Sequence, residues 1–494
     1  MRKSFCQAVA WTILLSQPSG LLAQHNPLID IPSVSVSSNS FISLHDGGAN
    51  PPARTAVTLS FYDDGSGSPD TGVPDGGTAE FKVAAGGSKV TFYENASGGA
   101  AMTVPKTWDM SNSANQSKFP LTIYAEGIEV SASSNDVELE FSHTEDGKTN
   151  TKTDKATVFK VEIEKCASDW LPKGGSEDNT TTIKAYTVPE SVKGKFKFTL
   201  AEVSQEKGYC MNLPLTLPAS GSEDAEDWKD LRFTDDQADF NVSGGNKEIA
   251  ETKTSDHKDA TVTVKSFDYG SYGKIKVDFT SLDGSVTVAG KEKGDSGRDY
   301  TRLPLDEDGE NGNQIADSAT QNSGPGGDKD KGDDKDNDPP GDGTDGDLQT
   351  RYEEYRGYIV NGSHVRTSTS KKTVFAVDKT GYSVAAGGGP LSLFVDKTGM
   401  EVKVMIDGEY VANTRRINLN GGTTAQRAIL VENDPATNGA WGATQGSKPS
   451  SYSDCRIWLN YHTRELALDK DLEAGFTGHL IYLEAANAGP GNDE

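Results

Sequence analysis

The stretch Ala156-Thr-Val-Phe-Lys-Val-Glu-Ile163 decides the fold, because polar and apolar residues alternate along most of it. A period of two puts successive side chains on opposite faces of an extended strand. Similar stretches occupy residues 78–83, 89–93 and 136–141, with clusters of Gly, Asn, Asp and Ser between them. Short strands separated by such turns predict an immunoglobulin-like β-sandwich module over residues 24–165.

A second β-sandwich module is predicted over residues 178–305. Stretches in which polar and apolar residues alternate begin near residues 182 and 194, and two more cover residues 260–267 and 273–279. We expect the last two to pair as a hairpin, because a turn-rich stretch joins them. The polar, acidic residues 221–239 predict a long loop.

The C-terminal residues 348–494 predict an α+β domain. A helix-competent stretch begins at Leu348 and stops at Gly357, and Asn361-Gly362 between two β-prone runs is typical of a hairpin turn. Further strands follow, and a second helix is expected at 466–474. The whole chain is therefore predicted to be mainly β and multidomain, with a flexible acidic linker before this last domain.

The N-terminus carries the pattern of an export signal. Arg2 and Lys3 precede an apolar run over residues 8–15, and small or helix-breaking residues follow. This pattern predicts a signal peptide over residues 1–23, with cleavage after Ala23, and therefore a secreted, cell-surface or periplasmic location. No later segment has the roughly 20 apolar residues of a spanning helix, so no membrane span is expected.

The formal charge of −26 is concentrated in one part of the chain. Residues 304–347 hold 14 Asp or Glu against 3 Lys, a net charge of −11. Such acidity argues against nucleic acid and anionic membranes as partners. A segment this acidic repels itself unless cations neutralise it, so residues 306–347 are predicted to form a calcium-type linker.

Two parts of this linker have oxygen-bearing side chains in alternation, with glycines at the bends. Calcium needs six or more oxygens, and the chain must curl to supply them. The first part has Ile315 as an apolar anchor, and the second is a twelve-residue window, 342–353, that resembles an EF-hand-like loop and is followed by Glu354. The predicted ligands are Asp306, Asp308, Asn311, Asn313 and Asp317 in the first site and Asp342, Thr344, Asp347 and Glu353 in the second. A calcium affinity of about 10⁻⁴ to 10⁻³ M is expected; the alternative is a solvated acidic spacer without metal.

Three cysteines follow the predicted signal peptide. Export permits disulfides, and we expect Cys166 to pair with Cys210, since both flank the same short stretch. The bond would contribute on the order of 4 kcal/mol in the chain-entropy model. Cys455 is left over, and the scattered positions do not have the spacing of a zinc site.

Several short runs between residues 302 and 372 carry a resemblance. They are Arg302-Leu-Pro-Leu-Asp306, Asn311-Gly-Asn-Gln-Ile-Ala-Asp317, Gly341-Asp-Gly-Thr344, Tyr352-Glu-Glu-Tyr-Arg-Gly-Tyr-Ile-Val-Asn-Gly-Ser-His-Val-Arg-Thr367 and Lys371-Lys372. Together they resemble a segment of large secreted bacterial proteins. In that group, immunoglobulin-like modules lead into an aspartate-rich linker and a C-terminal domain that in some members is a predicted zinc peptidase. The resemblance spans roughly residues 260–460.

The zinc activity of that group does not carry over to this sequence. A zincin needs two histidines one helical turn apart with a glutamate beside the first. None of the seven histidines forms such a pair; His462 and His479, the only two in the last hundred residues, are 17 positions apart. No nucleophile elbow or phosphate-binding loop is present either.

The sequence therefore predicts a non-catalytic binding or scaffolding protein with a calcium-stabilised linker, whose partner is an extracellular protein or glycan. One alternative is a truncated or degenerate relative of a secreted zinc metallopeptidase. Another is a carbohydrate-binding protein, for which Tyr269, Tyr272, Trp441 and Tyr452 are candidate stacking residues.

Overall fold

The computed structural model is mainly β, which confirms the predicted class of a multidomain β protein. It describes residues 26–30, 40–44, 54–62, 73–74, 76–174, 179–217, 228–295, 297–308, 312–321, 330–336, 338, 340, 346–379, 395, 399–421, 425–433, 442–444, 455–459, 465–468 and 483–486. The predicted signal peptide lies outside these residues. Within them, no helix has the length and apolar character needed to cross a membrane.

The first module buries an apolar core between two sheets. One sheet has the strand order β1-β3-β8-β5-β6, and the facing strands are β10-β9-β4-β7, with β2 parallel to β10. Alternation in the sequence explains the burial: Phe81, Leu139 and Phe141 point inward from one sheet, and Leu59 and Ile123 from the other. The elements are β1 Asn26–Asp30, β2 Ser40–Ser43, β3 Thr55–Tyr62, β4 Thr78–Ala85, η1 Gly87–Lys89, β5 Val90–Tyr93, β6 Ala101–Met102, β7 Lys106–Asp109, α1 Ser113–Gln116, β8 Leu121–Gly127, β9 Val137–Glu145 and β10 Lys148–Ile163.

The second module has the same two-layer construction. Its sheets are β13-β16-β11, continuing into β10, and β14-β15-β12-β17-β18, with β20 beside β17. Ile183 and Val262 from one layer meet Phe196 and Val277 from the other. The strands are β11 Thr180–Val188, β12 Gly194–Ala201, β13 Leu231–Phe233, β14 Phe240–Ser243, β15 Ile249–Thr252, β16 Asp259–Ser266, β17 Gly273–Ser281, β18 Thr287–Ala289, β19 Lys291–Glu292 and β20 Thr301–Leu303.

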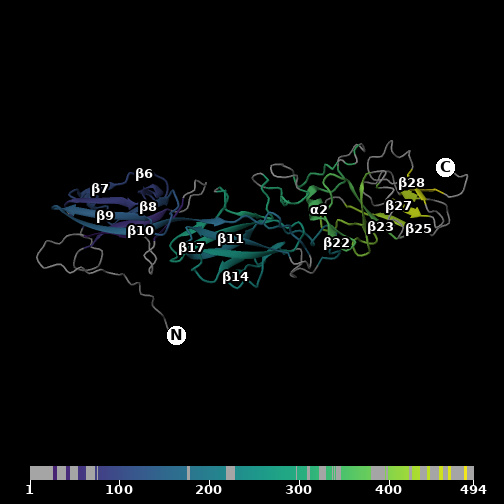
Figure 1. Ribbon diagram of the computed structural model, residues 1–494, viewed down its shortest axis with the longest axis horizontal. Helices are drawn as coiled ribbons and strands as arrows, with labels where there is room; N and C mark the ends of the chain where they lie inside the picture. Colours follow the sequence, from purple (N-terminus) through teal and green to yellow (C-terminus); the bar gives the residue numbers. More distant parts are fainter. Residues whose placement is uncertain are drawn as a thin grey trace, which may run out of the picture.

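Strand β10 belongs to both modules (Figure 1). Its residues 148–156 pair with β9 in the first module, and residues 160–163 pair with β11 in the second. At the crossing point, Val158 enters the first core and the next residue, Phe159, enters the second. A single nine-stranded sheet therefore runs through both modules without a connecting linker.

Two details of the second module differ from expectation. The predicted hairpin of β16 and β17 is wrong: β16 pairs with β11 and β13, whereas β17 pairs with β12, β18 and β20 in the opposite sheet. Alternation fixes which residues face a core but not which strand lies alongside. The predicted loop over 221–239 also contains β13, which pairs with β16.

Beyond residue 350 the chain forms helix α2 (Arg351–Arg356) and the hairpin of β21 (Tyr358–Val360) and β22 (Ser363–Val365). The hairpin turns at Asn361-Gly362, both in the left-handed region, as predicted. Helix α2 begins with a capping box at Thr350 and ends before Gly357, which confirms the predicted helix with a later start.

The C-terminal sheet has the order β24-β23-β25-β27-β26 and is parallel except for β26. Phe375, Val377 and Leu430 from this sheet share a core with Met211 of the second module. The predicted helix over 466–474 is wrong at its start, where β28 forms, and residues 469–474 lie outside the described part. The strands of this sheet are β23 Thr373–Asp378, β24 Glu401–Met405, β25 Ile429–Asn433, β26 Gly442–Thr444 and β27 Cys455–Leu459, and a separate antiparallel pair consists of β28 Glu465–Leu468 and β29 Leu483–Ala486.

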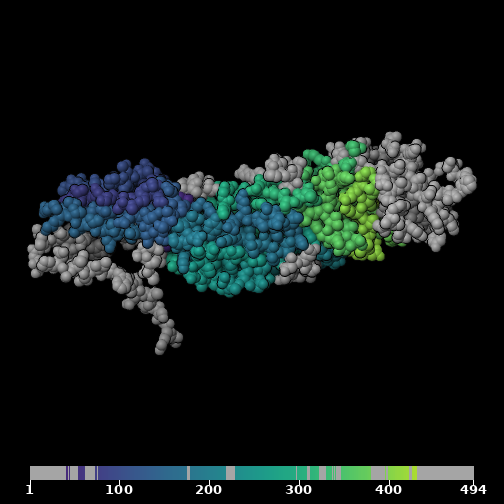
Figure 2. All heavy atoms as spheres, viewed as in Figure 1, coloured from purple at the N-terminus to yellow at the C-terminus, as the bar shows by residue number. Residues whose placement is uncertain are grey.

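The three parts follow one another along the long axis of the molecule, from purple through teal to green (Figure 2). The acidic segment between the second module and α2 is packed in its described residues: Ile315, Ala316 and Ala319 form a small core with Tyr352 and Tyr355. Ile315 is fully buried, as expected of an apolar anchor. This segment therefore lies where the second module meets the C-terminal sheet.

Candidate metal centres

Three aspartates gather just after strand β20. One carboxylate oxygen from each of Asp306, Asp308 and Asp317 lies within 4.8 Å of the others, and we name this group the first cage. Gly312 has φ 68°, and a Cβ there would come 2.2 Å from Asp306 Oδ2. Glycine is required at this position because it supplies both the left-handed turn and the space for the carboxylate.

Backbone N–H groups hold the first cage in shape. Asp308 N donates to Asp306 Oδ1 at 3.1 Å and Gln314 N to Asp306 Oδ2 at 2.8 Å, while Glu307 N donates to both oxygens of Asp317. Burial raises the pKa of Asp306, and it raises the pKa of Asp317 to about 6. Carboxylates crowded together out of water favour either a proton or a cation between them.

A second cage forms before helix α2. One oxygen each from Asp334, Asp336 and Asp347 lies within the same 4.8 Å limit. Asp347 N and Leu348 N donate to the two oxygens of Asp334 at 3.0 and 2.8 Å, which folds the segment back on itself. Gly346, at φ 87°, makes room for this, since a Cβ there would lie 1.9 Å from Asp334 Oδ1.

The second cage contains a buried oxygen without a donor. Asp336 is 2% exposed, and its Oδ2 has no hydrogen-bond partner among the described residues. Burial and the neighbouring Asp334 raise the pKa of Asp336 to about 7, and burial raises that of Asp347 well above its usual range. Buried oxygens are normally paired, so the Asp336 carboxylate fits the ligand set of a hard cation.

The structure revises the predicted ligands. In the first site Asp306, Asp308 and Asp317 come together, but Asn313 uses its side chain to bond Asp308 Oδ2 and Ile315 N. In the second site Asp347 belongs to the cage. Glu353 instead accepts a hydrogen bond from Thr350 N at 2.8 Å as part of the helix cap. Asn311, Asp342 and Thr344 lie outside the described residues.

Sequence analysis missed two members of the second cage, Asp334 and Asp336. They stand in a run where Asp and Lys recur at nearly every second position, so no spacing distinguishes them. The signal that identifies them is tertiary: the left-handed Gly346 brings Asp347 back beside residue 334.

Both cages are attached to the folded parts on either side. Asp317 N donates to Leu305 O next to β20, and Lys165 pairs with Glu307 beside the first cage. In the second cage, Asp347 Oδ2 accepts a hydrogen bond of 2.7 Å from Thr373 N, the first residue of β23. A cation in the first cage would therefore fix the acidic segment to the end of the second module, and one in the second cage would fix it to the start of β23.

The predicted disulfide is wrong in this structure, because Cys166 and Cys210 are both free and buried. The Cys166 sulfur faces Thr181 Oγ1 at 3.8 Å, whereas the Cys210 sulfur donates to Asn212 Oδ1 at 3.2 Å. Burial raises the pKa of each thiol to about 11. Closeness along the chain did not bring the two sulfurs together, and both behave as small core residues.

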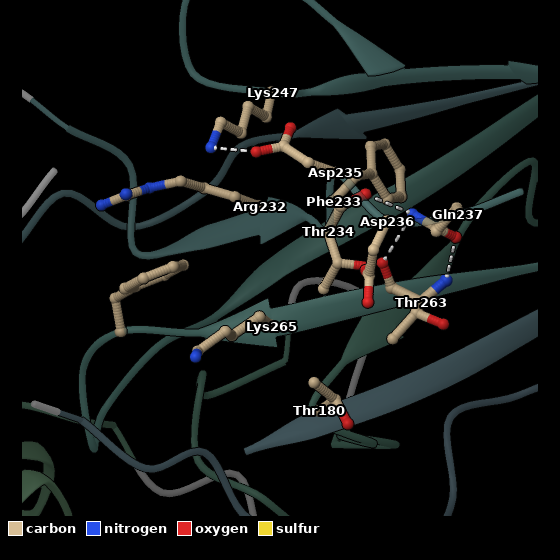
Figure 3. Close-up of a pocket in the computed structure, with 11 residues that line it drawn as sticks. Thr180, Arg232, Phe233, Thr234, Asp235, Asp236, Gln237, Lys247, Thr263 and Lys265 are labelled. Carbon is tan, nitrogen blue, oxygen red and sulfur yellow. Dashed lines mark hydrogen bonds and ion pairs between the residues drawn. The ribbon is translucent and has the colours of Figure 1, made fainter. Parts of the chain in front are cut away.

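A pocket of about 590 Å³ opens at the edge of the second module (Figure 3). Lys247 pairs with Asp235 at 2.7 Å across it, and Gln237 bonds the backbone of Thr234 and Thr263, sealing the edge of β16. Its lining residues are Thr180, Arg232, Phe233, Thr234, Asp235, Asp236, Gln237, Lys247, Thr263, Lys265 and Phe267. None of them belongs to either cage.

Two of the four aromatic residues considered for sugar stacking pack against other rings of the protein. Tyr269 is 4% exposed and stacks on His364 with 3.5 Å between ring centroids. Tyr272 meets Tyr352 edge to face. Trp441 and Tyr452 lie outside the described residues.

Comparisons with known proteins leave the family open. No family model matches the chain, and no curated protein matches it. Among solved structures, it is similar at 10% identity to the human F-spondin reeler domain (TM-score 0.18; 29% of this chain, 86% of that chain). It is also similar, at 10% identity and a TM-score of 0.18, to the C-terminal domain of the Streptococcus agalactiae AgI/II polypeptide BspA, over 54% of this chain and 98% of that chain. A third similar structure is a Parabacteroides merdae β-glucuronidase, at 10% identity and a TM-score of 0.16, over 54% of this chain and 24% of that chain. Similarities this weak support no conclusion about fold or function.

Proposed function

We propose that this chain is a secreted or cell-surface binding or scaffolding protein without catalytic activity, in which calcium orders the acidic segment. The observation that carries the proposal is the second cage, where three aspartates converge beside β23 and the buried Oδ2 of Asp336 has no hydrogen-bond partner among the described residues. Oxygen-only ligands at a Gly-shaped turn suit Ca²⁺ better than Zn²⁺, which prefers His and Cys.

The proposal extends to the architecture. The two sandwich modules are immunoglobulin-like, and the part from residue 348 onward is a separate α+β domain that meets the binding partner. Calcium fixes the angle between these halves. The first cage adds a weaker site, since among the described residues none of its carboxylate oxygens is buried without a hydrogen-bond partner, as Asp336 Oδ2 is in the second cage.

A calcium titration followed by thermal unfolding tests the proposal. At a calcium concentration 100 times Kd, ligand binding adds about 2.7 kcal/mol to the unfolding free energy. For units of this size, we expect the midpoint to rise by roughly 5–10 °C. Asp336→Asn is the matched variant, because it removes one cage charge while the Asp334 and Asp347 bonds to backbone N–H groups remain.

Asp336→Asn should lose most of the calcium-induced rise in the unfolding midpoint, while Asp308→Asn should lose less of it. If the wild-type midpoint does not move up to about 10 mM calcium, well above the weak extracellular range, the segment is an acidic spacer. A shift produced by Zn²⁺ but not by Ca²⁺, together with proteolysis, would favour the metallopeptidase alternative.

A further inference from the structure

The pocket at the edge of the second module contains a row of polar side chains that crosses three strands. Arg232 of β13 lies directly opposite Lys265 of β16, and Lys265 in turn lies opposite Thr180 of β11. Side chains at directly opposite positions of neighbouring strands project from the same face of a sheet. All three line the pocket, so two positively charged side chains stand next to each other there (Figure 3).

Aromatic rings hold these two cations in place. Arg232 Cζ lies 3.9 Å from the ring centroid of Phe267 and 4.5 Å from that of Trp228, and Lys265 Nζ lies 5.6 Å from the centroid of Phe267. The Arg232 side chain, 3% exposed, also donates from Nε to Lys229 O at 2.8 Å. Cation–π contacts and this hydrogen bond fix the guanidinium before any ligand arrives, which lowers the entropy cost of binding.

The charge of the pocket favours an anion. Its lining has three Lys or Arg against two Asp, although the whole chain carries a formal charge of −26. Lys247 pairs with Asp235 at 2.7 Å, whereas Arg232 and Lys265 face each other across neighbouring strands. Like charges at directly opposite positions repel, so an anionic group bound between them is stabilised by both. A guanidinium suits an oxyanion in particular, because its N–H groups match two oxygens at once.

The remaining side chains of the pocket suit a ligand rich in hydroxyl groups. Thr234 and Thr263 supply hydroxyls, and the exposed Asp236 adds a carboxylate that can accept hydrogen bonds. Figure 3 shows these three residues grouped together, to the right of the two cations. The volume of about 590 Å³ falls within the range of about 300–1,000 Å³ that is typical of small-ligand sites. A sugar that carries an acidic group would use both parts of the pocket.

The backbone at this edge is already bonded, which disfavours a peptide as the ligand. Phe233 N donates to Lys247 O at 3.0 Å, and the side chain of Gln237 bonds both N and O of Thr263. A peptide that adds a strand to a sheet needs free backbone donors and acceptors. The overall negative charge also repels a long nucleic-acid backbone. Recognition at this pocket therefore depends on side chains.

We propose that this pocket binds an acidic oligosaccharide, whose carboxylate or sulfate group is held by Arg232 and Lys265 and whose hydroxyl groups bond the remaining polar side chains. The pocket shares no residue with either cage, so the inference does not depend on calcium. It gives the second module a ligand of its own, in addition to the partner proposed for the C-terminal domain.

Lys265→Gln and Lys184→Gln form a matched pair that tests the inference. Lys184 is on β11 of the same sheet and lies 5.8 Å from the ring centroid of Tyr186, but it does not line the pocket. Each variant loses one positive charge. The full chain is titrated calorimetrically, in EDTA, with tetragalacturonate, which carries carboxylates, and with a κ-carrageenan tetrasaccharide, which carries sulfates. We expect Lys265→Gln to weaken binding by about tenfold, as for the loss of one charge-assisted hydrogen bond, and Lys184→Gln to leave it within about threefold of the parent.

Arg232→Lys is an independent test, because it keeps the charge and removes the planar guanidinium. It should also weaken binding, since an ammonium group cannot contact two oxygens in the same way. Affinity should fall as NaCl is raised, because salt screens the attraction between the charges. The sugar that binds more tightly identifies the anionic group, and the uncharged methyl ester of tetragalacturonate should not bind.

Three results would overturn the inference. The first is that neither acidic sugar binds the parent, and the second is an equal loss of affinity in Lys265→Gln and Lys184→Gln, which would mean attraction to charge anywhere on the sheet. The third is binding of tetraglutamate as tightly as the sugars, because the pocket would then recognise an anion without a saccharide.

Discussion

Single glycines shape both cages. Gly312 and Gly346 have positive φ, and a Cβ at either would fall within 2.2 Å of a cage carboxylate oxygen. The cage side chains, which could hold a cation, depend on residues that contribute no ligand atom. A search of the sequence for oxygen donors alone overlooks this requirement.

Gly346→Ala should therefore abolish the calcium-induced rise in the unfolding midpoint. The added methyl group collides with Asp334 Oδ1, which must move out of the cage. Gly362→Ala is the control, because Gly362 also has positive φ, at 76°, yet a Cβ there meets nothing within 4 Å. Both variants should lose about 1 kcal/mol from backbone strain. A calcium response that survives in Gly346→Ala as well as in Gly362→Ala would contradict the role given to this glycine.

Glu353 shows where prediction from sequence stops at this scale. The sequence predicted Glu353 as a ligand at the start of α2, whereas its side chain caps the helix. That role depends on the geometry of the folded helix start, which the spacing of oxygen-bearing residues does not reveal. Asp334 and Asp336 were missed for the same reason, since contacts made by a turn far along the chain select them.

At the level of elements, alternation predicted the strands well because it records which side of each strand is buried. The alternating stretches at residues 136–141 and 156–163 correspond to strands β9 and β10, and β21 and β22 turn at Asn361-Gly362 as predicted. Which strands lie next to each other was not predictable, because β16 and β17 follow one another in the sequence but pair with other strands in opposite sheets. The sequence also did not predict that β10 belongs to both modules. Val158 and Phe159 are simply two adjacent apolar residues in the sequence, although their side chains enter different cores.

Phe159→Ala tests the shared strand. Phe159 packs edge to face on Phe41 and Phe279 at 5.9 and 5.7 Å, so its loss should cost about 3–5 kcal/mol. Because β10 pairs with β9 in the first module and with β11 in the second, we expect faster hydrogen exchange in both of these strands. Val158→Ala, which removes apolar volume from the first core, should lower the unfolding free energy by less than Phe159→Ala. It should still speed hydrogen exchange in both modules. If hydrogen exchange in Phe159→Ala became faster in the second module only, the two modules would unfold independently.

On the scale of the whole molecule, the junction after the second module contains a fully buried ion pair. Arg356 and Asp268 are both 0% exposed, and Arg356 also donates to the backbone carbonyls of Lys207 and Asn420. These contacts join the second module, helix α2 and the C-terminal part. Removing one partner of such a pair leaves an uncompensated charge in the interior.

Arg356→Met should therefore destabilise the protein by about 3–5 kcal/mol, measured by urea unfolding. The double variant with Asp268→Asn should recover part of this loss, because the orphaned carboxylate is removed. Equal destabilisation in the single and double variants would mean that the backbone contacts of Arg356, and not its charge, hold the junction.

The strand shared by the two modules also bears on how the molecule responds to force. Modules joined by a flexible linker extend one at a time when pulled from their ends. Here β10 lies in the sheets of both neighbours, so a pull along the long axis loads its hydrogen bonds to β9 and β11 in shear at the same moment. The first two modules should consequently rupture as a single mechanical unit.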